Sequence, residues 1–129
     1  MAAICHYRWL ASPRRRSRSE DYLYGPDLES FAKDGTLTSL RVAFSREDPK
    51  KKVYVQHLMA QDAARLRELV VERQAYVFVC GDGAKMARDV HGCLVEILVG
   101  HSSLGDEAKA GKYLAGMTRE GRYVRDIWS

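Results

Sequence analysis

The sequence predicts an α/β protein in which a parallel sheet carries helices on both faces, a three-layer arrangement. Three observations support this fold class. Apolar segments of strand length alternate along the chain with segments whose apolar residues recur at helical spacing. One segment, residues 75–79 (AYVFV), is almost continuously apolar, as is typical of a central parallel strand. At 129 residues, the chain has the size of one domain with one core.

The first elements after the N-terminal segment are a short helix and a strand. Pro26 suits the first turn of this helix, and Leu28 and Phe31 share its apolar face. Gly35 can end the helix in a left-handed cap. Residues 37–45 (LTSLRVAFS) then have the length and the β-branched, apolar content of a strand.

The second half of the chain continues the alternation. Residues 55–70 predict one amphipathic helix, because their apolar positions form a stripe at helical spacing. The strand at residues 75–79 follows, and then helices over residues 86–97 and 107–118. Residues 123–128 (YVRDIW) alternate like a last strand. This order favours a parallel layer of the nucleotide-binding type.

Residues 1–19 differ in composition from the rest and are interpreted as an arginine-rich, flexible lead-in. The chain has a net charge of +4, but five arginines precede the first acidic residue, Glu20. From Glu20 onward, 16 basic residues face 17 acidic ones. The basic excess therefore belongs to the lead-in, and binding of nucleic acid by the whole domain loses its main support.

The cysteines and the hydropathy indicate a cytoplasmic protein. The chain has three cysteines, an odd number, and their spacing matches no pattern of metal ligands; they are Cys5, Cys80 and Cys93. The four histidines match no such pattern either, so we expect no metal site. No uncharged apolar stretch has the length of a membrane span, and residues 1–9 do not form a signal peptide. Nor does the chain contain the motifs of common hydrolases or a phosphate-binding P-loop.

Polar and reactive residues follow three of the predicted strands. These are residues 45–46, 80–82 and 126–128. Because the carboxyl ends of parallel strands meet at one edge of a sheet, these residues should converge where α/β sheets bind ligands.

One group of residues has the chemistry of a phosphate and adenine site. Its members are Ser45, Arg46, Lys52, Tyr54 and Gln56. A guanidinium, an ammonium and a hydroxyl together can hold a phosphate monoester, and an aromatic ring can stack on adenine. The alternative reading is that the lysines at residues 50–52, with Arg46, form a solvated turn.

A second group combines a thiol with a carboxylate and an indole. Cys80 ends an apolar strand and precedes Gly81, so its sulfur could face a ligand, although an isolated cysteine is more often a small buried hydrophobe. Asp126 and Trp128 are two residues apart and point to the same side of the last strand.

Three segments, in this order along the chain, resemble the NADPH-binding module at the C-terminus of diflavin reductases. Their sequences are FSREDPKKKVYVQH, VFVCGDGAKMARDV and GRYVRDIWS. This family includes NADPH-haemoprotein reductases and methionine synthase reductase, and it belongs to the ferredoxin-NADP reductase superfamily. The resemblance runs from about Glu20 to Ser129. It therefore implies an NADPH-binding domain at residues 20–129.

The resemblance implies a role for each matching residue. The 2′-phosphate and adenosine of NADPH would be held by Ser45, Arg46, Lys52, Tyr54 and Gln56. Asp89 would be a further cofactor contact. Cys80 would lie beside the nicotinamide. Trp128 would stack on the flavin and move aside for the nicotinamide, while Asp126 would orient Cys80 and support developing charge. The catalytic residues would thus be Cys80, Asp126 and Trp128.

The chain also departs from the family pattern. The family module begins with a strand and a glycine-rich turn, and no such stretch precedes Tyr22, so both are expected to be missing. The FAD-binding and flavodoxin-like domains are absent as well. We therefore expect a fragment, an alternative start or an incomplete gene product, incapable of turnover alone.

The leading hypothesis is the NADPH-binding portion of a diflavin oxidoreductase that passes hydride to FAD and electrons through FMN to a haem or cobalamin protein. Its partners would be the flavin domains of the same polypeptide and that acceptor protein. The full-length enzyme would be cytoplasmic, or anchored to the endoplasmic reticulum facing the cytosol. The alternative is a non-catalytic remnant that acts only in nucleotide binding or interaction. Nucleic-acid binding through the arginine run is a third reading.

Overall fold

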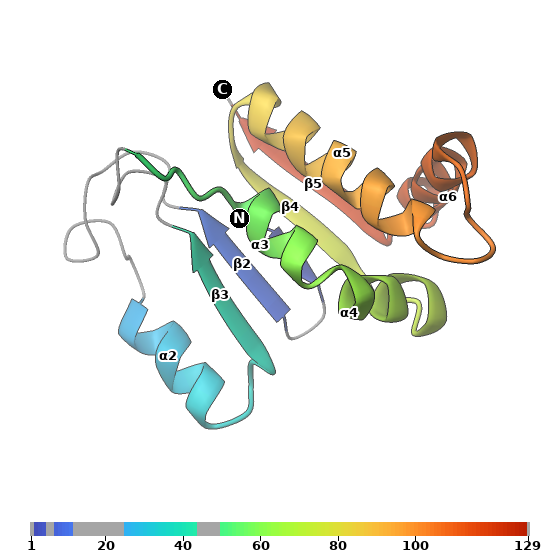
Figure 1. Ribbon diagram of the computed structural model, residues 1–129. Coiled ribbons are helices and arrows are strands. Elements are labelled where there is room, and N and C mark those ends of the chain that lie inside the picture. Colours follow the sequence, from blue (N-terminus) through green and yellow to red (C-terminus); the bar gives the residue numbers. More distant parts are fainter. Residues whose placement is uncertain (1, 5–6, 12–24, 44–49, 129) are drawn as a thin grey trace.

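A computed structural model describes residues 2–4, 7–11, 25–43 and 50–128 of the chain. The elements in chain order are β1 Ala2–Ile4, β2 Tyr7–Ala11, α2 Gly25–Lys33, β3 Ser39–Ala43, α3 Val55–Gln61, α4 Ala63–Arg67, the π-helical η1 Glu68–Glu72, β4 Val77–Asp82, α5 Ala84–Val99, α6 Glu107–Arg119 and β5 Tyr123–Trp128. Helices and strands alternate as predicted from residue 25 onward, so the α/β class is confirmed (Figure 1).

The sheet has five strands in the order β3-β2-β1-β4-β5. The pairs β2·β3 and β4·β5 are parallel. The parallel direction of β4 and β5 was predicted, whereas β2 was not predicted as a strand. β1 is antiparallel to both of its neighbours, so the sheet is mixed and the prediction of an all-parallel sheet is wrong at its centre. The reason is local: a connection of only two residues joins Ile4 to Tyr7, and antiparallel neighbours need no crossover.

The N-terminal residues contribute more to the sheet than the sequence predicts. Residues 2–4 and 7–11 are strands, so interpreting them as part of a flexible lead-in is wrong. The absence of the family's first strand and glycine-rich turn stays a prediction, because β1 occupies the position between β2 and β4 but is antiparallel to both. The remainder of the lead-in, residues 12–19, lies outside the described residues. The domain boundary at residue 20 stays a prediction.

The amphipathic segment 55–70 is not one helix. It divides at Asp62, whose backbone (φ −95°, ψ 16°) leaves the helical region between α3 and α4, and its last residues are π-helical. Arg41 of β3 contacts this break, because its guanidinium donates to Gln61 Oε1 at 2.6 Å and lies 3.7 Å from the Asp62 carboxylate. The break therefore coincides with a contact between the helix layer and the sheet.

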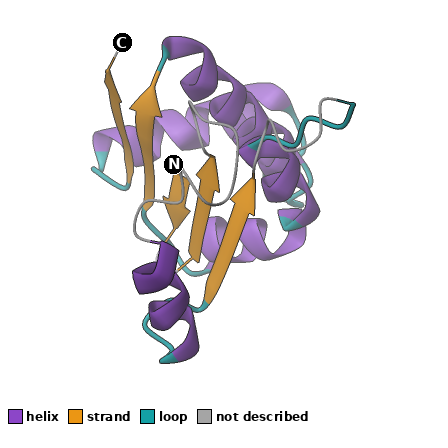
Figure 2. Cartoon of the chain, turned by 90° about the vertical axis from the view of Figure 1, so that its left-hand side faces the viewer, coloured by secondary structure: helices purple, strands orange, loops and turns teal. Residues whose placement is uncertain are grey.

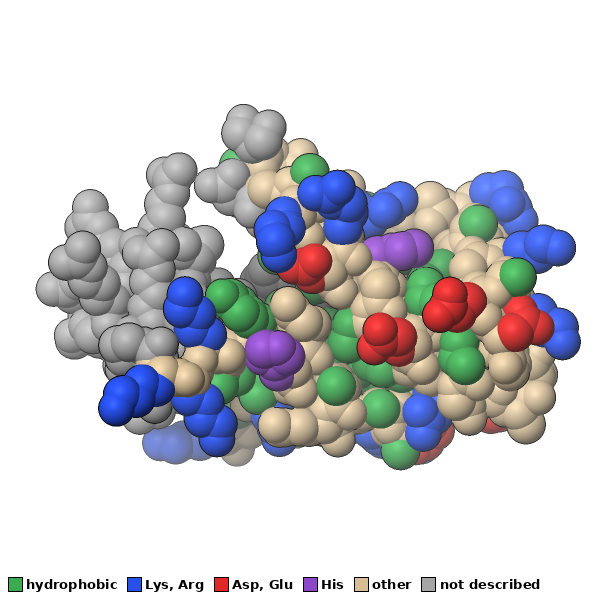
Figure 3. All heavy atoms as spheres, turned by 45° about the horizontal axis from the view of Figure 1, so that its top comes forward, with side chains coloured by type: hydrophobic (Ala, Val, Ile, Leu, Met, Phe, Trp, Pro, Cys, Tyr) green, Lys and Arg blue, Asp and Glu red, His purple; other side chains and the backbone are tan. Residues whose placement is uncertain are grey.

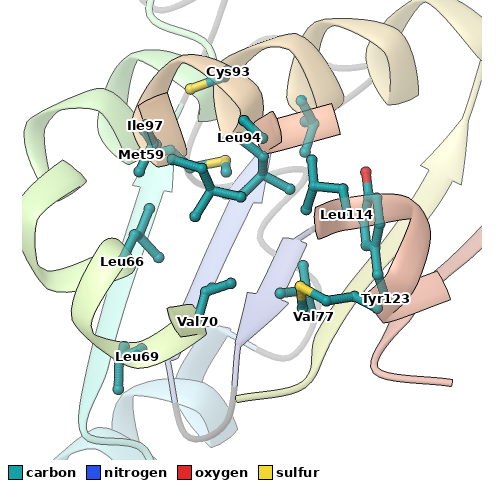
Figure 4. Packing of buried hydrophobic residues seen from close by; sticks show 14 of the residues in the cluster. Met59, Leu66, Leu69, Val70, Val77, Cys93, Leu94, Ile97, Leu114 and Tyr123 are labelled. Atoms are coloured by element: carbon teal, nitrogen blue, oxygen red, sulfur yellow. The ribbon is translucent and has the colours of Figure 1, made fainter. Parts of the chain in front are cut away.

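One face of the sheet packs against α3, α4, η1, α5 and α6 and forms the core. Its most deeply buried side chains come from every one of these elements and from β4 and β5, as Figure 4 shows for Met59, Leu66, Val70, Leu94, Leu114 and Tyr123. α2 stands apart from the other helices, beside β3 (Figure 1, Figure 2). The predicted three-layer arrangement stays a prediction.

The opposite face of β4 and β5 carries exposed aromatic side chains. Tyr76 and Phe78 stack with ring centroids 6.4 Å apart, and Val124 and Trp128 are exposed on the neighbouring strand. Their alternation with buried Val77 and Tyr123 is the period-two pattern of a sheet with one covered face. Among the described residues, no helix is both long and apolar enough to cross a membrane.

Candidate functional site

A pocket of about 410 Å³ opens between the first turns of α3 and α5, near the carboxyl ends of the parallel strands. It is lined by Tyr54, Val55 and Gln56 on the α3 side and by Gly83, Lys85, Met86 and Asp89 on the α5 side. Three of the predicted cofactor residues, Tyr54, Gln56 and Asp89, thus line one pocket. Asp89 lies far along the chain from the other two, so the fold brings them together.

The α3 wall of the pocket is fixed by buried packing. Val55 is fully buried, which anchors the backbone between Tyr54 and Gln56. The Cys93 thiol of α5 donates to the Gln56 carbonyl oxygen at 3.4 Å and so joins the two helices behind the pocket. Tyr54 itself stays 40% exposed.

The α5 wall carries a charged pair that the sequence patterns did not bring to attention. Lys85 Nζ donates to Asp89 Oδ2 at 2.8 Å, and this bond and the Asp89 charge raise the pKa of Lys85, with a smaller contribution from Tyr54. The i,i+4 spacing of the two residues is a signal that could have identified the pair.

Gly83 forms the turn between β4 and α5. Its φ of 103° is a conformation that side chains rarely adopt, and a Cβ at this position would meet no other atom within 4 Å. The Gly83 N–H donates to the Trp128 carbonyl oxygen at 2.9 Å, which ties the end of β5 to the lip of the pocket.

The second predicted group lies at the ends of β4 and β5. Cys80 is the register partner of Asp126, and Asp82 is the register partner of Trp128, because β4 and β5 run parallel. Cys80 is half-buried, whereas Asp126 is exposed and Trp128 is 57% exposed. Cys80, Asp126 and Trp128 alternate with core-facing neighbours in their strands and so share the open face of the sheet. The thiol, the carboxylate and the indole therefore lie on one face of the sheet, opposite to the face that packs against α3 and α5.

Two predicted site residues cannot be placed, and a third does not line the pocket. Ser45 and Arg46 lie outside the described residues. Lys52 is described and exposed, two residues before Tyr54, but the pocket lining does not include it.

The surface near this end of the molecule carries both signs of charge. Figure 3, in which the top of Figure 1 comes forward, shows Lys and Arg side chains interspersed with Asp, Glu and His. Within the part of the chain that the structure describes, this side has no continuous basic stripe of the kind that binds nucleic acid.

Comparison with known proteins identifies relatives of the chain. It is 46% identical over 114 residues to the NADPH–cytochrome P450 reductase of Bos taurus, 46% identical to that of Drosophila melanogaster and 45% identical to that of Homo sapiens. Each match covers 88% of this chain but 16% of the relative, so the chain spans about a sixth of the length of the reductases it matches. No protein-family profile matches the chain.

Proposed function

We propose that this chain is the C-terminal NADPH-binding portion of a diflavin reductase. The chain is homologous to a segment of the NADPH–cytochrome P450 reductases and so related to the diflavin reductases. The observation that carries the proposal is the pocket lined together by Tyr54, Gln56 and Asp89. These three residues match cofactor contacts that the family resemblance implies, and they come from two distant segments of the chain. Their meeting in one pocket supports a common ligand.

The adenosine end of NADPH is assigned to the α3 side of the pocket. The Tyr54 ring offers a face for adenine stacking, and the Gln56 amide offers hydrogen bonds to the ribose or the base. Ser45, Arg46 and Lys52 would hold the 2′-phosphate, because charge-assisted hydrogen bonds suit a phosphate monoester. An unphosphorylated ribose would leave Arg46 and Lys52 without an anion, which is the basis of selectivity for NADPH over NADH.

The nicotinamide end is assigned to Cys80, Asp126 and Trp128. NADPH supplies the hydride, and the protein contributes placement and exclusion of water. The exposed Trp128 indole would cover the flavin when no nicotinamide is present. Asp126 would orient the Cys80 thiol, its register partner, and support positive charge that develops on the nicotinamide ring. Gly81 and Gly83, which have no side chains, follow Cys80 on either side of Asp82.

The whole reaction needs more protein than this chain. FAD and FMN would be bound by flavin domains, and the electrons would pass to a haem or cobalamin protein. Since the chain spans 16% of its relatives, we propose that it binds nucleotide but does not turn over alone.

A ligand titration tests the binding function. Calorimetry of the full 129-residue chain with NADPH, 2′-AMP and 5′-AMP should show binding of the first two and much weaker binding of 5′-AMP, because only the first two carry the 2′-phosphate. Equal affinity for 2′-AMP and 5′-AMP, or no affinity for either, would reject the proposal. No affinity in a chain that is folded by circular dichroism would favour the non-catalytic remnant.

Arg46→Ala tests the assignment of the phosphate site. We expect 2′-AMP binding to weaken by about 1.5–3 kcal/mol, because one charge-assisted hydrogen bond is lost. Arg73→Ala is the matched control, since Arg73 pairs with Glu68 and neither residue lines the pocket. An unchanged affinity of the Arg46 variant would move the phosphate site elsewhere.

A further inference from the structure

Tyr54 stands at the pocket wall at the point where the chain enters α3. Its side chain is 40% exposed, and it precedes α3 as the N-cap residue, with an extended backbone (φ −109°, ψ 163°). The first backbone N–H groups of a helix have no partner within the helix and need one from outside. The group that binds the backbone at Tyr54 therefore helps to set the direction of the Tyr54 ring.

His57 fixes the N-cap through a reciprocal pair of hydrogen bonds. The Tyr54 N–H donates to His57 Nδ1 at 3.0 Å, and the His57 N–H donates to the Tyr54 carbonyl oxygen at 3.0 Å. The bond to Nδ1 is one half of a capping box, in which the side chain at the third helical position accepts from the N-cap backbone; the Tyr54 side chain does not supply the other half. Glutamate or glutamine usually takes this position, and here a histidine does so.

The His57 ring also contacts the Tyr54 ring. The ring centroids lie 5.5 Å apart at an interplanar angle of 59°, a tilted arrangement that aromatic pairs favour. One residue thus restrains both the backbone and the side chain of Tyr54. His57 itself is exposed and does not line the pocket.

We propose that His57 is a positioning residue for nucleotide binding: it accepts the Tyr54 N–H at Nδ1 and thereby holds the Tyr54 ring in place for the adenine. This inference rests on the proposed function. Because Nδ1 accepts, the proton of the neutral ring lies on Nε2, and His57 needs no contact with the nucleotide. Its effect on binding passes through Tyr54 alone.

Calorimetry with 2′-AMP on the full chain tests the inference with two substitutions of opposite design. His57→Phe keeps an aromatic ring beside Tyr54 but removes the acceptor, whereas His57→Gln removes the ring and restores the usual capping-box acceptor. We expect His57→Phe to weaken 2′-AMP binding about fivefold, as for the loss of one hydrogen bond, and His57→Gln to remain within about twofold of the unsubstituted chain.

A double-substitution cycle separates positioning from a general effect on the fold. In a Tyr54→Ala background, His57→Phe should cause no further loss of affinity, because the ring that His57 positions is gone. A loss of the same size in both backgrounds would overturn the inference, and so would His57→Phe binding as tightly as the unsubstituted chain. Thermal melting of each variant checks that it is folded, and His57→Ala replaces His57→Phe if the latter is not.

The two proposals fail in different ways. If the unsubstituted chain binds no 2′-AMP, the proposed function is rejected and this inference with it. If the unsubstituted chain binds 2′-AMP and the cycle shows no coupling between residues 54 and 57, only the role of His57 is rejected.

Discussion

Burial changes the chemistry of Cys93 in α5. Burial raises the pKa of its thiol to about 11, and the charge of Glu96 adds to the shift. Because the thiolate is the reactive form, we expect iodoacetamide at about pH 8 to modify Cys93 slowly in the native chain and rapidly in denaturant. Peptide mapping by mass spectrometry measures both rates. Equal rates in the two conditions would contradict the burial of this side chain.

His91 makes the stability of the chain depend on pH. Its ring stacks on Tyr123, Nδ1 lies 3.2 Å from the Tyr123 hydroxyl, and burial together with the charge of Arg125 lowers its pKa below the ordinary value of 6.5. The unfolded chain therefore binds a proton at a higher pH than the folded chain does. Stability from this group is complete above about pH 6.5 and decreases as the pH falls toward the folded-state pKa. Urea unfolding at several pH values should show this decrease, and His91→Gln should reduce it. The same pH dependence in both proteins would contradict the assignment.

At the scale of elements, the C-terminal turn of α5 contacts Arg67 of α4. Arg67 Nη1 donates to the Ile97 carbonyl oxygen at 3.2 Å, and a Cβ on Gly100 would lie 2.6 Å from that nitrogen. We expect Gly100→Ala to lower the free energy of unfolding by about 0.5–1 kcal/mol, because it displaces a guanidinium that satisfies a helix-end carbonyl. Urea unfolding measures the change.

Two further variants control this prediction. In an Arg67→Ala background, Gly100→Ala should become stabilising, since the clash is gone and alanine restricts the unfolded chain. Gly92→Ala, in the exposed middle of α5 with nothing within 4 Å, should stabilise by about 0.5–1 kcal/mol in either background. Destabilisation by Gly100→Ala without Arg67 would exclude the proposed clash.

At the scale of the whole molecule, β1 joins the two parallel halves of the sheet. It pairs with β2 on one side and β4 on the other, over three residues. Proline removes a ladder hydrogen bond and is not tolerated in a central strand. Ala3→Pro should therefore cause loss of hydrogen-exchange protection in β2 and β3 while β4, β5 and α5 remain protected. Ala3→Val, which keeps the N–H, is the control. An equal loss of hydrogen-exchange protection in all strands would contradict the division of the sheet into β2·β3 and β4·β5.

Much of the fold could be predicted because its signals are local. Residues 123–128 alternate in polarity and form β5 at those bounds, and the helix predicted after Pro26 is α2. The strand predicted at residues 75–79 begins two residues later and continues to Asp82, because residues 80–82 also pair with β5. Local patterns thus located these three elements to within a few residues.

The errors share a non-local cause. β1 takes its central place in the sheet by pairing with β4, which begins only at Val77, and the break at Asp62 coincides with Arg41, 21 residues away in the chain. Neither relation is visible in a window of neighbouring residues. The pocket residue Lys85 was missed for a different reason. Its spacing to Asp89 is visible in the sequence, but only the structure shows that both residues share a pocket with Tyr54.

The sequence by itself determined the α/β class, most of the elements and the residue types able to bind a phosphorylated nucleotide, because hydrophobic period and side-chain chemistry are properties of short segments. Only the tertiary structure decided that Tyr54, Gln56 and Asp89 line one pocket, that β1 runs antiparallel between the two parallel halves, and that Cys80 and Asp126 are partners in register. Those relations depend on strand pairing and helix packing between residues far apart in the chain, which are settled when the core forms.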